Sequence, residues 1–469
     1  MRVYFYGFIM LFKKFILRMN TGKVILSFVE KMGVVYIKLA QILAMQNYGN
    51  LFTENDRILL SKICDHCKPI HFKKIKKIIE KEYGCSIEEK FRYVDPNPVG
   101  SASISQVHKA VLKNGDIVAL KVRRQDITRK IEKDIKQMKR IVRRYGRIFR
   151  FKNILGSDTA LDLYLSWILE EVDFKHEARN IVKYSQFAKN VNNKVQNTVT
   201  IRVPRVYKKL SNENIIVMEF IFAKTINQMS LSKKNKLKIS KSLNDYVKLS
   251  FYAFFRDVPV VFHGDPHGGN IYIDEHGSIG FLDMGLIFTI DGEDKKIVKD
   301  LFFSAYNQNV DKLIAILTRE SSFTAYDNNK FYQDIEECCK RFREIPVTQF
   351  FVEMIGVFTK YNMSPPDVLF TMAKAFVALY GINRFIDNKI DTESLLMEQI
   401  TEYYVNRCVS DIKDVFKVGS SILPKFLQTT LDKGLIAGVS EALKPLGELN
   451  KKVNQFTENC NEVLDCFKG

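Results

Sequence analysis

The stretch His263-Gly264-Asp265-Pro266-His267-Gly268-Gly269-Asn270 places an aspartate and an asparagine five positions apart on a predicted loop. A second acidic motif, Asp283-Met284-Gly285, follows at the end of the next predicted hairpin. Magnesium-dependent phosphoryl transfer uses a loop aspartate beside the attacking hydroxyl or water, an asparagine on magnesium, and a second aspartate that joins magnesium to the phosphates. The order of the motifs predicts Asp265 as the residue that orients the nucleophile, and Asn270 and Asp283 as ligands of Mg²⁺. Each motif alone is also a common turn, so the prediction depends on what lies upstream.

A lysine that could contact nucleotide phosphates lies upstream, at the end of Val118-Ala119-Leu120-Lys121. In kinases such a strand holds an ammonium group against the α- and β-phosphates of ATP, so Lys121 is the predicted phosphate contact. The lysine needs a helix carboxylate to orient it. Glu177, within Asp173-Phe174-Lys175-His176-Glu177-Ala178, is the predicted partner, and a surface acid of that helix is the alternative.

Small residues before this strand predict a second phosphate contact. The backbone amides of Gly100, Ser101, Ala102 and Ser103 could approach phosphate closely, because nothing bulky covers them. The run lacks the spacing of a Walker loop and the three glycines of the usual kinase loop. A small-residue turn is therefore the alternative.

A candidate base-binding segment follows at Ile216-Val217-Met218-Glu219-Phe220, which resembles the strand that leads into adenine recognition in kinases. Met218 would line the back of the pocket, and the backbone at Glu219 and beyond would meet the adenine. An ordinary core strand has the same pattern, so that alternative stays open.

The composition bears on partners and compartment. A formal net charge of +19 attracts phosphates, nucleic acids or acidic lipid headgroups. No zinc-finger spacing, single-strand aromatic signature or recognition helix accompanies it, so nucleic acid is not an expected partner. Eight cysteines without a secretory pattern favour a reducing compartment.

The first 29 residues are basic and aromatic and contain no acid. They favour an organelle presequence or a helix on an anionic membrane surface, with an amphipathic helix packed on the domain as the alternative. The apolar runs Val3–Phe12 and Val368–Ile386 are respectively too short and too often interrupted to span a bilayer. We expect no transmembrane span and a membrane-associated location, in the mitochondrion or at the cytoplasmic face of a membrane.

Hydrophobic periodicity predicts an α+β protein with a small β-rich lobe followed by a helical lobe. The predicted helices are Ile25–Met45, Asn55–Ile63, Ile127–Tyr145 with a dense Lys/Arg face, Leu161–Phe187, a helix from about Gly292, and a core helix Val368–Ile386. The predicted strands are Val107–Leu112 and Ile117–Val122 joined at Asn114-Gly115, Val203–Leu210, Ile215–Phe220, and a hairpin of Asn270–Ile273 and Ile279–Asp283.

Together these motifs resemble the UbiB/AarF family of atypical protein-kinase-like ATPases associated with ubiquinone and other isoprenoid-lipid metabolism. The resemblance runs from about Lys31 to Asp391. It includes Lys38-Leu39-Ala40-Gln41, which is similar to the family's Lys-x-Gly-Gln motif, and Glu171-Val172-Asp173, which matches its Glu-x-Asp motif. Ala40 replaces the family glycine, and the phosphate loop contains glycine and serine where the family form is rich in alanine. These departures bear on regulation and rate more than on nucleotide binding.

The resemblance implies a two-lobed, protein-kinase-like fold with an added N-terminal helical extension. Lys38 and Gln41 would lie across the cleft near Glu171 and Asp173 and cover the groove where a protein substrate would bind. The expected domains are a basic N-terminal segment (1–30), the helical extension (31–95), the N-lobe (96–222), the C-lobe (223–400) and a helical tail (401–469).

The sequence therefore predicts an ATP- and Mg²⁺-dependent ATPase or small-molecule kinase that supports ubiquinone or other isoprenoid-lipid metabolism. Its expected partners are nucleotide, a lipid or lipid precursor, and an anionic membrane surface or lipid-biosynthesis complex. No long activation segment or Ala-Pro-Glu anchor follows Asp283, and Gly264 replaces the usual arginine, which argues against protein phosphorylation. The alternatives are a catalytically weak scaffold that binds nucleotide and partner proteins at a membrane, and a module in which nucleotide turnover drives lipid extraction.

Overall fold

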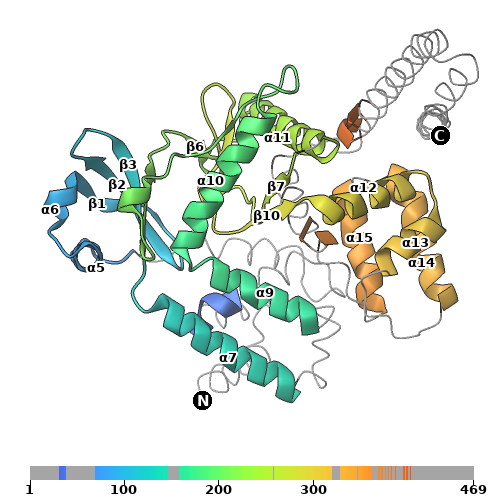
Figure 1. Ribbon diagram of the computed structural model, residues 1–469, viewed down its shortest axis with the longest axis horizontal. Coiled ribbons are helices and arrows are strands. Elements are labelled where there is room, and N and C mark those ends of the chain that lie inside the picture. The colour runs from blue at the N-terminus through green and yellow to red at the C-terminus, as the bar shows by residue number, and fades with distance from the viewer. Residues whose placement is uncertain are drawn as a thin grey trace, which may run out of the picture.

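The computed structural model describes residues 31–37, 69–145, 158–256, 258–318, 328–345 and 347–361, together with scattered positions between 368 and 402. A small lobe built on a sheet stands beside a larger, mostly helical lobe, and α10 lies between them (Figure 1). Within this part of the chain, no helix is both long and apolar enough to cross a membrane.

The small lobe is a four-stranded antiparallel sheet. Its strands are β1 (Phe91–Ser101), β2 (Ser105–Leu112), β3 (Ile117–Arg123) and β5 (Ile215–Glu219), in the order β1-β2-β3-β5. The predicted β2–β3 hairpin is confirmed. Gly115 has a φ of 92°, which favours glycine, and the Asn114 side chain accepts a hydrogen bond from the backbone N–H of Asp116.

The two faces of this sheet have different roles. On the outer face, α5 (Phe72–Tyr83) and α6 (Ile87–Lys90) bury Ile75, Ile79 and Ile87 against alternate residues of β3 and β5. The inner face presents Val107, Ala119, Lys121 and Met218 toward the other lobe. Because side chains alternate along a strand, one face is left for the cleft once the other is covered.

Two helices, not one, follow the small lobe's hairpin and the basic helix α7 (Ile127–Tyr145). The single helix predicted over Leu161–Phe187 is wrong: α9 (Asp158–Glu170) ends before Glu171, and α10 (Phe174–Val191) begins after Asp173. The Asp173 side chain accepts a hydrogen bond of 3.1 Å from the His176 backbone N–H, so it caps α10. Apolar residues recur at helical spacing on both sides of this break, so the sequence pattern did not reveal it.

The predicted strand Val203–Leu210 is also wrong. This segment begins after β4 (Ile201–Arg202) and contains one bridge between Val206 and Met218 and a 3-10 turn at Lys208–Leu210. Pro204 lacks an N–H and cannot continue a ladder. The adjoining predicted strand is confirmed as β5.

Two further small sheets are separate from the sheet of the small lobe. One has the order β4-β9-β8-β6, where β6 (Lys224–Thr225) and the predicted hairpin β8 (Ile271–Ile273) and β9 (Ile279–Phe281) pair antiparallel, and β4 pairs parallel with β9. The other pairs β7 (Val260–His263) with β10 (Ile287–Ile290). Sequence reasoning missed this pair, because four-residue apolar runs do not distinguish a strand from a buried helix turn.

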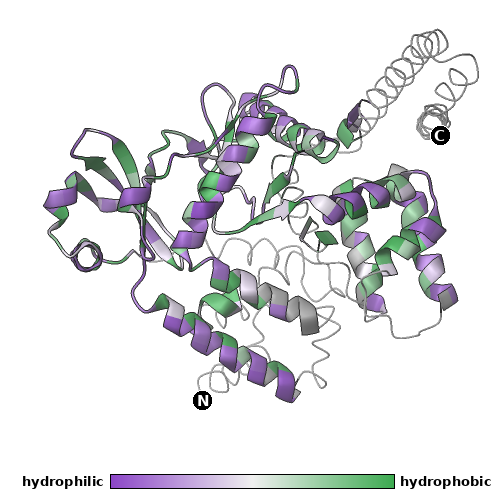
Figure 2. Cartoon of the chain, in the orientation of Figure 1, coloured by the Kyte–Doolittle hydropathy of each residue, from purple (hydrophilic) through white to green (hydrophobic). Residues whose placement is uncertain are grey.

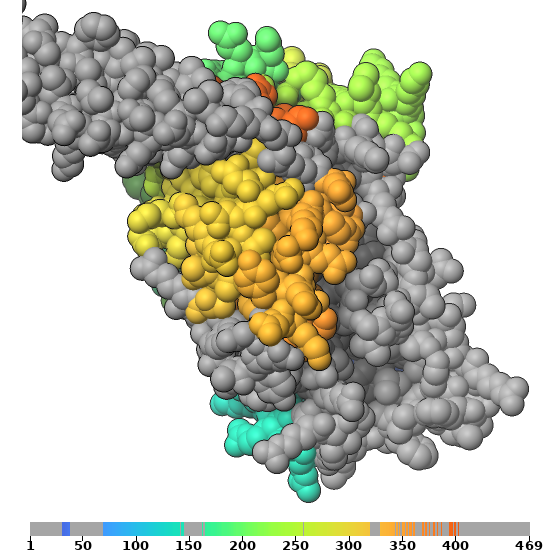
Figure 3. All heavy atoms as spheres, turned by 90° about the vertical axis from the view of Figure 1, so that its right-hand side faces the viewer, coloured from blue at the N-terminus to red at the C-terminus, as the bar shows by residue number. Residues whose placement is uncertain are grey.

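The helical lobe surrounds a core of Phe, Ile and Leu side chains. Its helices are α11 (Lys233–Phe254), α12 (Gly292–Tyr306), α13 (Val310–Thr318), α14 (Asn328–Lys340) and α15 (Val347–Lys360), with 3-10 turns at Ile226–Gln228 and Arg341–Arg343. Helices α12 to α15 gather on one side of the molecule, seen in yellow and orange in Figure 3. The helix predicted from about Gly292 is confirmed as α12. The described positions of Val368–Ile386 are helical, and all of them but Thr371 are buried.

Several predicted features lie outside the described residues. They include Lys38, Gln41, the helix Asn55–Ile63, the first 30 residues and all of the tail after 402. Of the predicted helix Ile25–Met45, residues 31–37 are helical except at Gly33, whose φ is 119°. Val35 and Tyr36 are buried there.

Candidate active site

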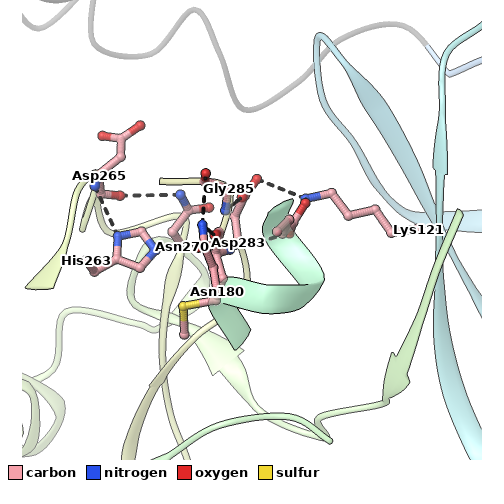
Figure 4. A network of polar contacts seen from close by, with 9 residues as sticks. Lys121, Asn180, His263, Asp265, Asn270, Asp283 and Gly285 are labelled. Carbon is pink, nitrogen blue, oxygen red and sulfur yellow. Dashed lines mark hydrogen bonds and ion pairs between the residues drawn. The ribbon is translucent and has the colours of Figure 1, made fainter. Parts of the chain in front are cut away.

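The side chains of Lys121 and Asp283 meet at the boundary between the lobes (Figure 4), and Glu177 contacts the same lysine. Lys121 Nζ on β3 lies 2.7 and 2.8 Å from the two carboxylate oxygens of Glu177 on α10. It also lies 3.2 Å from Asp283 Oδ2, just beyond β9. Three elements far apart in the sequence thus place one ammonium between two carboxylates, the partnership predicted for Lys121 and Glu177.

The two carboxylates have different surroundings. Glu177 is fully buried, whereas the Asp283 side chain is 45% exposed. Burial, reinforced by Asp283 and opposed by Lys121, raises the pKa of Glu177 to about 7. Burial lowers the pKa of Lys121, but Asp283 and Glu177 outweigh it, so the pKa lies above its usual range and the lysine stays charged. Asp283 is therefore the carboxylate that a ligand can reach.

Helix α10 fixes the Asp283-Met284-Gly285 motif through two side chains one turn apart. Glu177 Oε1 accepts from the Met284 backbone N–H at 3.4 Å, and Asn180 Nδ2 donates to the carbonyls of Met284 at 2.9 Å and Gly285 at 3.3 Å. The Gly285 N–H donates in turn to Asp283 Oδ1 at 2.9 Å. The helix that orients the lysine thus also orients the second aspartate.

The predicted catalytic loop connects β7 to β8. The Asn270 amide Nδ2 donates to the Asp265 carbonyl at 3.4 Å, and the Asn270 carbonyl accepts from the Leu282 N–H at 2.9 Å. The first contact spans the loop and the second joins it to the end of β9, one residue before Asp283. In Figure 4 the Asp265 carboxylate points away from His263 and Asn270.

His263 connects both halves of the site, a role that sequence reasoning did not assign. Its Nδ1 accepts from the Asp265 N–H at 3.1 Å, its Nε2 donates to the Asp283 carbonyl, and its ring stacks on Phe281 with centroids 4.5 Å apart. Burial lowers the pKa of this imidazole, which keeps it neutral with one donor and one acceptor. The only available signal was its position two residues before Asp265.

Gly264 occupies a place that no side chain could share. A Cβ there would lie 2.6 Å from the Leu286 side chain and 2.7 Å from that of Phe288. The Gly264 N–H also donates to the Leu286 carbonyl at 2.9 Å. Packing of β7 against β10 therefore explains why glycine replaces the arginine common in regulated kinases.

The predicted phosphate loop is a tight hairpin turn. Gly100 and Ser101 belong to β1, opposite Val107 and Gln106, whereas Ala102 and Ser103 form the turn. The Ala102 N–H donates to the Ser105 carbonyl at 2.9 Å. Arg124, which sequence reasoning did not single out, donates to the Ala102 carbonyl and the Ser101 hydroxyl, both at 2.9 Å. A guanidinium after β3 thus holds the turn in place.

At the predicted base-binding segment, Met218 is buried beside Ala119 on the inner face of the sheet. The Glu219 N–H donates to the Arg205 carbonyl at 2.8 Å, and the Phe220 N–H donates to the Ile117 carbonyl at 3.2 Å. The Glu219 carboxylate contacts Arg202 at 3.1 Å. Hydrogen-bond donors for a base must therefore come from farther along the chain or from side chains.

The arrangement of lysine, helix glutamate, loop aspartate and second aspartate is that of a kinase-like site, and a family model supports it. Residues 62–317 match the ABC1 atypical kinase-like domain. The chain belongs to the ABC1 atypical kinase-like family. The family match confirms the predicted kinase-like fold class. It also confirms the predicted resemblance to the UbiB group, because several relatives of this chain are named UbiB.

Relatives of known sequence extend the match beyond the ABC1 domain. An uncharacterized protein encoded in the hydrogenase 1 5′ region of Clostridium pasteurianum is 27% identical over 452 residues, covering 91% of this chain and 82% of its own. A probable protein kinase UbiB of Vibrio cholerae is 28% identical over 375 residues, covering 77% of this chain and 66% of its own. Among solved structures, an erythromycin complex of Rv3197 from Mycobacterium tuberculosis matches with a TM-score of 0.49 and 19% identity, covering 84% of this chain and 95% of that one.

Of the ABC1 motif residues outside the ordinary kinase set, Glu171 and Asp173 are described and Lys38 and Gln41 are not. Glu171 lies beside Gly285 of the Asp283-Met284-Gly285 motif, because a Cβ on Gly285 would be 3.6 Å from the Glu171 Cγ. Arg123 Nη1 on β3 donates to the Val172 carbonyl at 2.7 Å. The break between α9 and α10 is therefore tied to the strand that carries Lys121.

The donor set suits a magnesium ion that arrives with nucleotide. In the described part of the chain, no group of three or more His, Cys, Asp or Glu side chains is placed to hold a metal ion alone. Mg²⁺ is commonly held by one or two protein oxygens together with substrate phosphates. Asp283 offers a partly exposed carboxylate, and Asn270 offers its amide oxygen because Nδ2 faces the Asp265 carbonyl.

Proposed function

We propose that this chain is a magnesium-dependent ATPase or small-molecule kinase. The observation that carries the proposal is the contact of Lys121 with both Glu177, at 2.7 Å, and Asp283, at 3.2 Å. A structural ion pair needs one carboxylate. The second, partly exposed carboxylate beside a fixed ammonium suits a site for phosphates and a divalent cation.

Each residue has a role in this proposal. Lys121 binds the α- and β-phosphates, and Glu177 holds that lysine in place. Asp283 and Asn270 would hold Mg²⁺, which when bound neutralises phosphate charge. The turn at Ala102 and Ser103 covers the phosphates. Asp265 orients the attacking hydroxyl or water, and His263 keeps Asp265 and Asp283 in register through their backbones.

The acceptor is small or is water, not a protein. Only the short strand β10 separates Asp283 from α12, so the described chain has no long segment there on which a peptide could dock. Relatives are named for UbiB, and on that basis we propose an isoprenoid lipid or its precursor, within ubiquinone or similar metabolism, as the physiological substrate.

An anionic membrane surface is the proposed place of action. Helix α7 buries Ile127, Ile131, Ile135 and Met138 on one side and is strongly hydrophilic on the other (Figure 2). The helix has eight exposed cations: Arg129, Lys130, Lys133, Lys136, Lys139, Arg140, Arg143 and Arg144. Such a stripe is attracted to acidic headgroups.

Phosphate release from ATP tests the proposal. We expect magnesium-dependent release by the wild-type protein, and a loss of at least about a hundredfold in Asp265→Asn and Asp283→Asn. Asp291→Asn removes an exposed carboxylate that makes no capping hydrogen bond, and it serves as the control. Wild-type binding of Mg-ATP without release or transfer, with or without lipid precursors, would favour the scaffold instead.

A further inference from the structure

The inner face of the small sheet has two successive cross-strand rows. Val107, Lys121 and Ile216 form one row, and Lys109, Ala119 and Met218 form the next. Neighbouring residues on one face of a strand are about 7 Å apart along it. Met218 of the predicted base-binding segment belongs to the second row, so a nucleotide whose phosphates lie at Lys121 would extend its sugar and base toward the row of Lys109.

Beyond that row lies an aromatic pair with a cation above it. Phe220 and Phe222 pack edge to face with ring centroids 4.9 Å apart. Lys109 Nζ lies 5.4 Å from the Phe220 centroid and 5.0 Å from that of Phe222. The rings belong to the connection between β5 and β6, where the chain passes from the small sheet to the sheet of the helical lobe.

Phe222 is an unusual residue for this position, because 69% of its surface is exposed. An apolar ring that stays exposed to water contributes no hydrophobic free energy to folding. Phe220, by contrast, packs partly against the main core. Phe222 contacts Phe220 and Lys109, and the rest of its ring surface is left exposed.

We propose that Lys109 and Phe222 form the base subsite of the nucleotide pocket, in which the ring of Phe222 stacks on the adenine and the Lys109 ammonium donates a hydrogen bond to an acceptor on the nucleoside. The inference rests on the proposed function, since it takes the phosphates to lie at Lys121. The N–H groups of Glu219 and Phe220 already donate to backbone carbonyls, so donors for a base must come from farther along the chain or from side chains such as Lys109. Stacking on an aromatic ring and a nearby cation both favour a flat, electron-rich base.

Calorimetric titration with two probes tests the subsite. Mg-ATP carries a base, and magnesium tripolyphosphate carries only the phosphates. We expect Phe222→Ala and Lys109→Met each to weaken Mg-ATP binding by about tenfold while tripolyphosphate binding stays within about twofold of wild type. Leu237→Ala, at an equally exposed apolar residue, and Lys113→Met, at the exposed end of the same hairpin, are the matched controls and should change neither affinity.

The outcomes separate the two proposals. If the wild-type protein binds neither probe, the proposed function fails. If it binds both, and the Phe222 and Lys109 variants bind Mg-ATP as tightly as the wild type, the base subsite is wrong and the proposed function stands. An equal loss for both probes would also overturn the subsite, because it would place these side chains at the phosphates.

Discussion

Lys121, Asp265, Asn270 and Asp283 could be selected from sequence as candidates, because phosphoryl transfer limits which residue types can serve and in which order they occur. Asn180 and His263 could not be assigned roles in the same way. Both act on backbone atoms: Asn180 contacts the carbonyl of Met284, 104 positions away, and His263 contacts that of Asp283. Every residue type has a backbone carbonyl, so a contact with one does not restrict which residue type provides it. The sequence therefore contains no second motif that would reveal such a contact.

Removing the charge of Glu177 tests the arrangement around Lys121. In Glu177→Gln the lysine keeps Asp283 as its remaining carboxylate and competes with magnesium for it. We expect Mg-ATP affinity to fall by about tenfold, as measured by calorimetric titration. Glu213→Gln is the control, because Glu213 forms only an exposed ion pair with Lys175 at 2.6 Å. Unchanged affinity in Glu177→Gln would show that Glu177 does not position the lysine.

At the scale of elements, the sequence predicted the hairpins well and the breaks poorly. Asn114-Gly115 and Glu275-His276-Gly277 are strong turn signals, and both hairpins form. The break at Glu171–Asp173 depends on a cap and on Arg123, which donates to the Val172 carbonyl from a strand 49 positions away. β7 and β10 depend on pairing with each other, which local patterns do not show.

Replacing either of two glycines by alanine should change the free energy of unfolding, in opposite directions. A Cβ on Gly280 in β9 would lie 2.4 Å from the Arg202 backbone oxygen, so Gly280→Ala should lower the free energy of unfolding by about 2 kcal/mol or more. Gly356 in α15 has nothing within 4 Å of its ideal Cβ, so Gly356→Ala should raise it by about 0.5–1 kcal/mol. Urea unfolding measures both. Equal effects of the two substitutions would contradict the packing of β4 against β9.

The attachment of the helical extension to the small sheet should depend on pH. Gln106 pairs through its amide with both backbone groups of Ile70, at 2.8 and 3.0 Å, so its remaining N–H faces His108 Nε2 at 2.9 Å. His108 Nδ1 lies 2.7 Å from the Asp95 carbonyl. A neutral imidazole satisfies both contacts and a protonated one cannot. Burial accordingly lowers the pKa of His108 from 6.5.

Because the unfolded chain binds this proton more readily, the contribution of His108 to stability is complete above pH 6.5 and is lost as the pH falls below it. We expect the free energy of unfolding to decrease from pH 7.5 to 5.5, and to decrease less in His108→Asn, which cannot be protonated. His263 has a lowered pKa for the same reason and should retain part of the slope. His276→Asn changes an exposed imidazole and is the control. An identical slope in His108→Asn and wild type would exclude this role for His108.

At the scale of the whole molecule, the net charge of +19 is consistent with a phosphate-rich or anionic partner, and the exposed face of α7 concentrates part of it. Replacing Lys133, Lys136 and Arg140 by glutamine should weaken binding to phosphatidylserine vesicles by at least about tenfold at low salt. The matched control replaces Lys233, Lys234 and Lys236 at the start of α11. Equal losses in the two variants, measured by vesicle co-sedimentation, would show that only the total charge matters.

The melting temperature with ATP, in the presence and absence of Mg²⁺, tests the magnesium-dependent nucleotide site most directly. A ligand that binds only the folded state must raise the melting temperature. We expect ATP with Mg²⁺ to raise it in the wild-type protein and Asp283→Asn to abolish the magnesium-dependent part of the rise. No rise with Mg-ATP, or the same rise in Asp283→Asn, would contradict the site assigned to Lys121, Asn270 and Asp283.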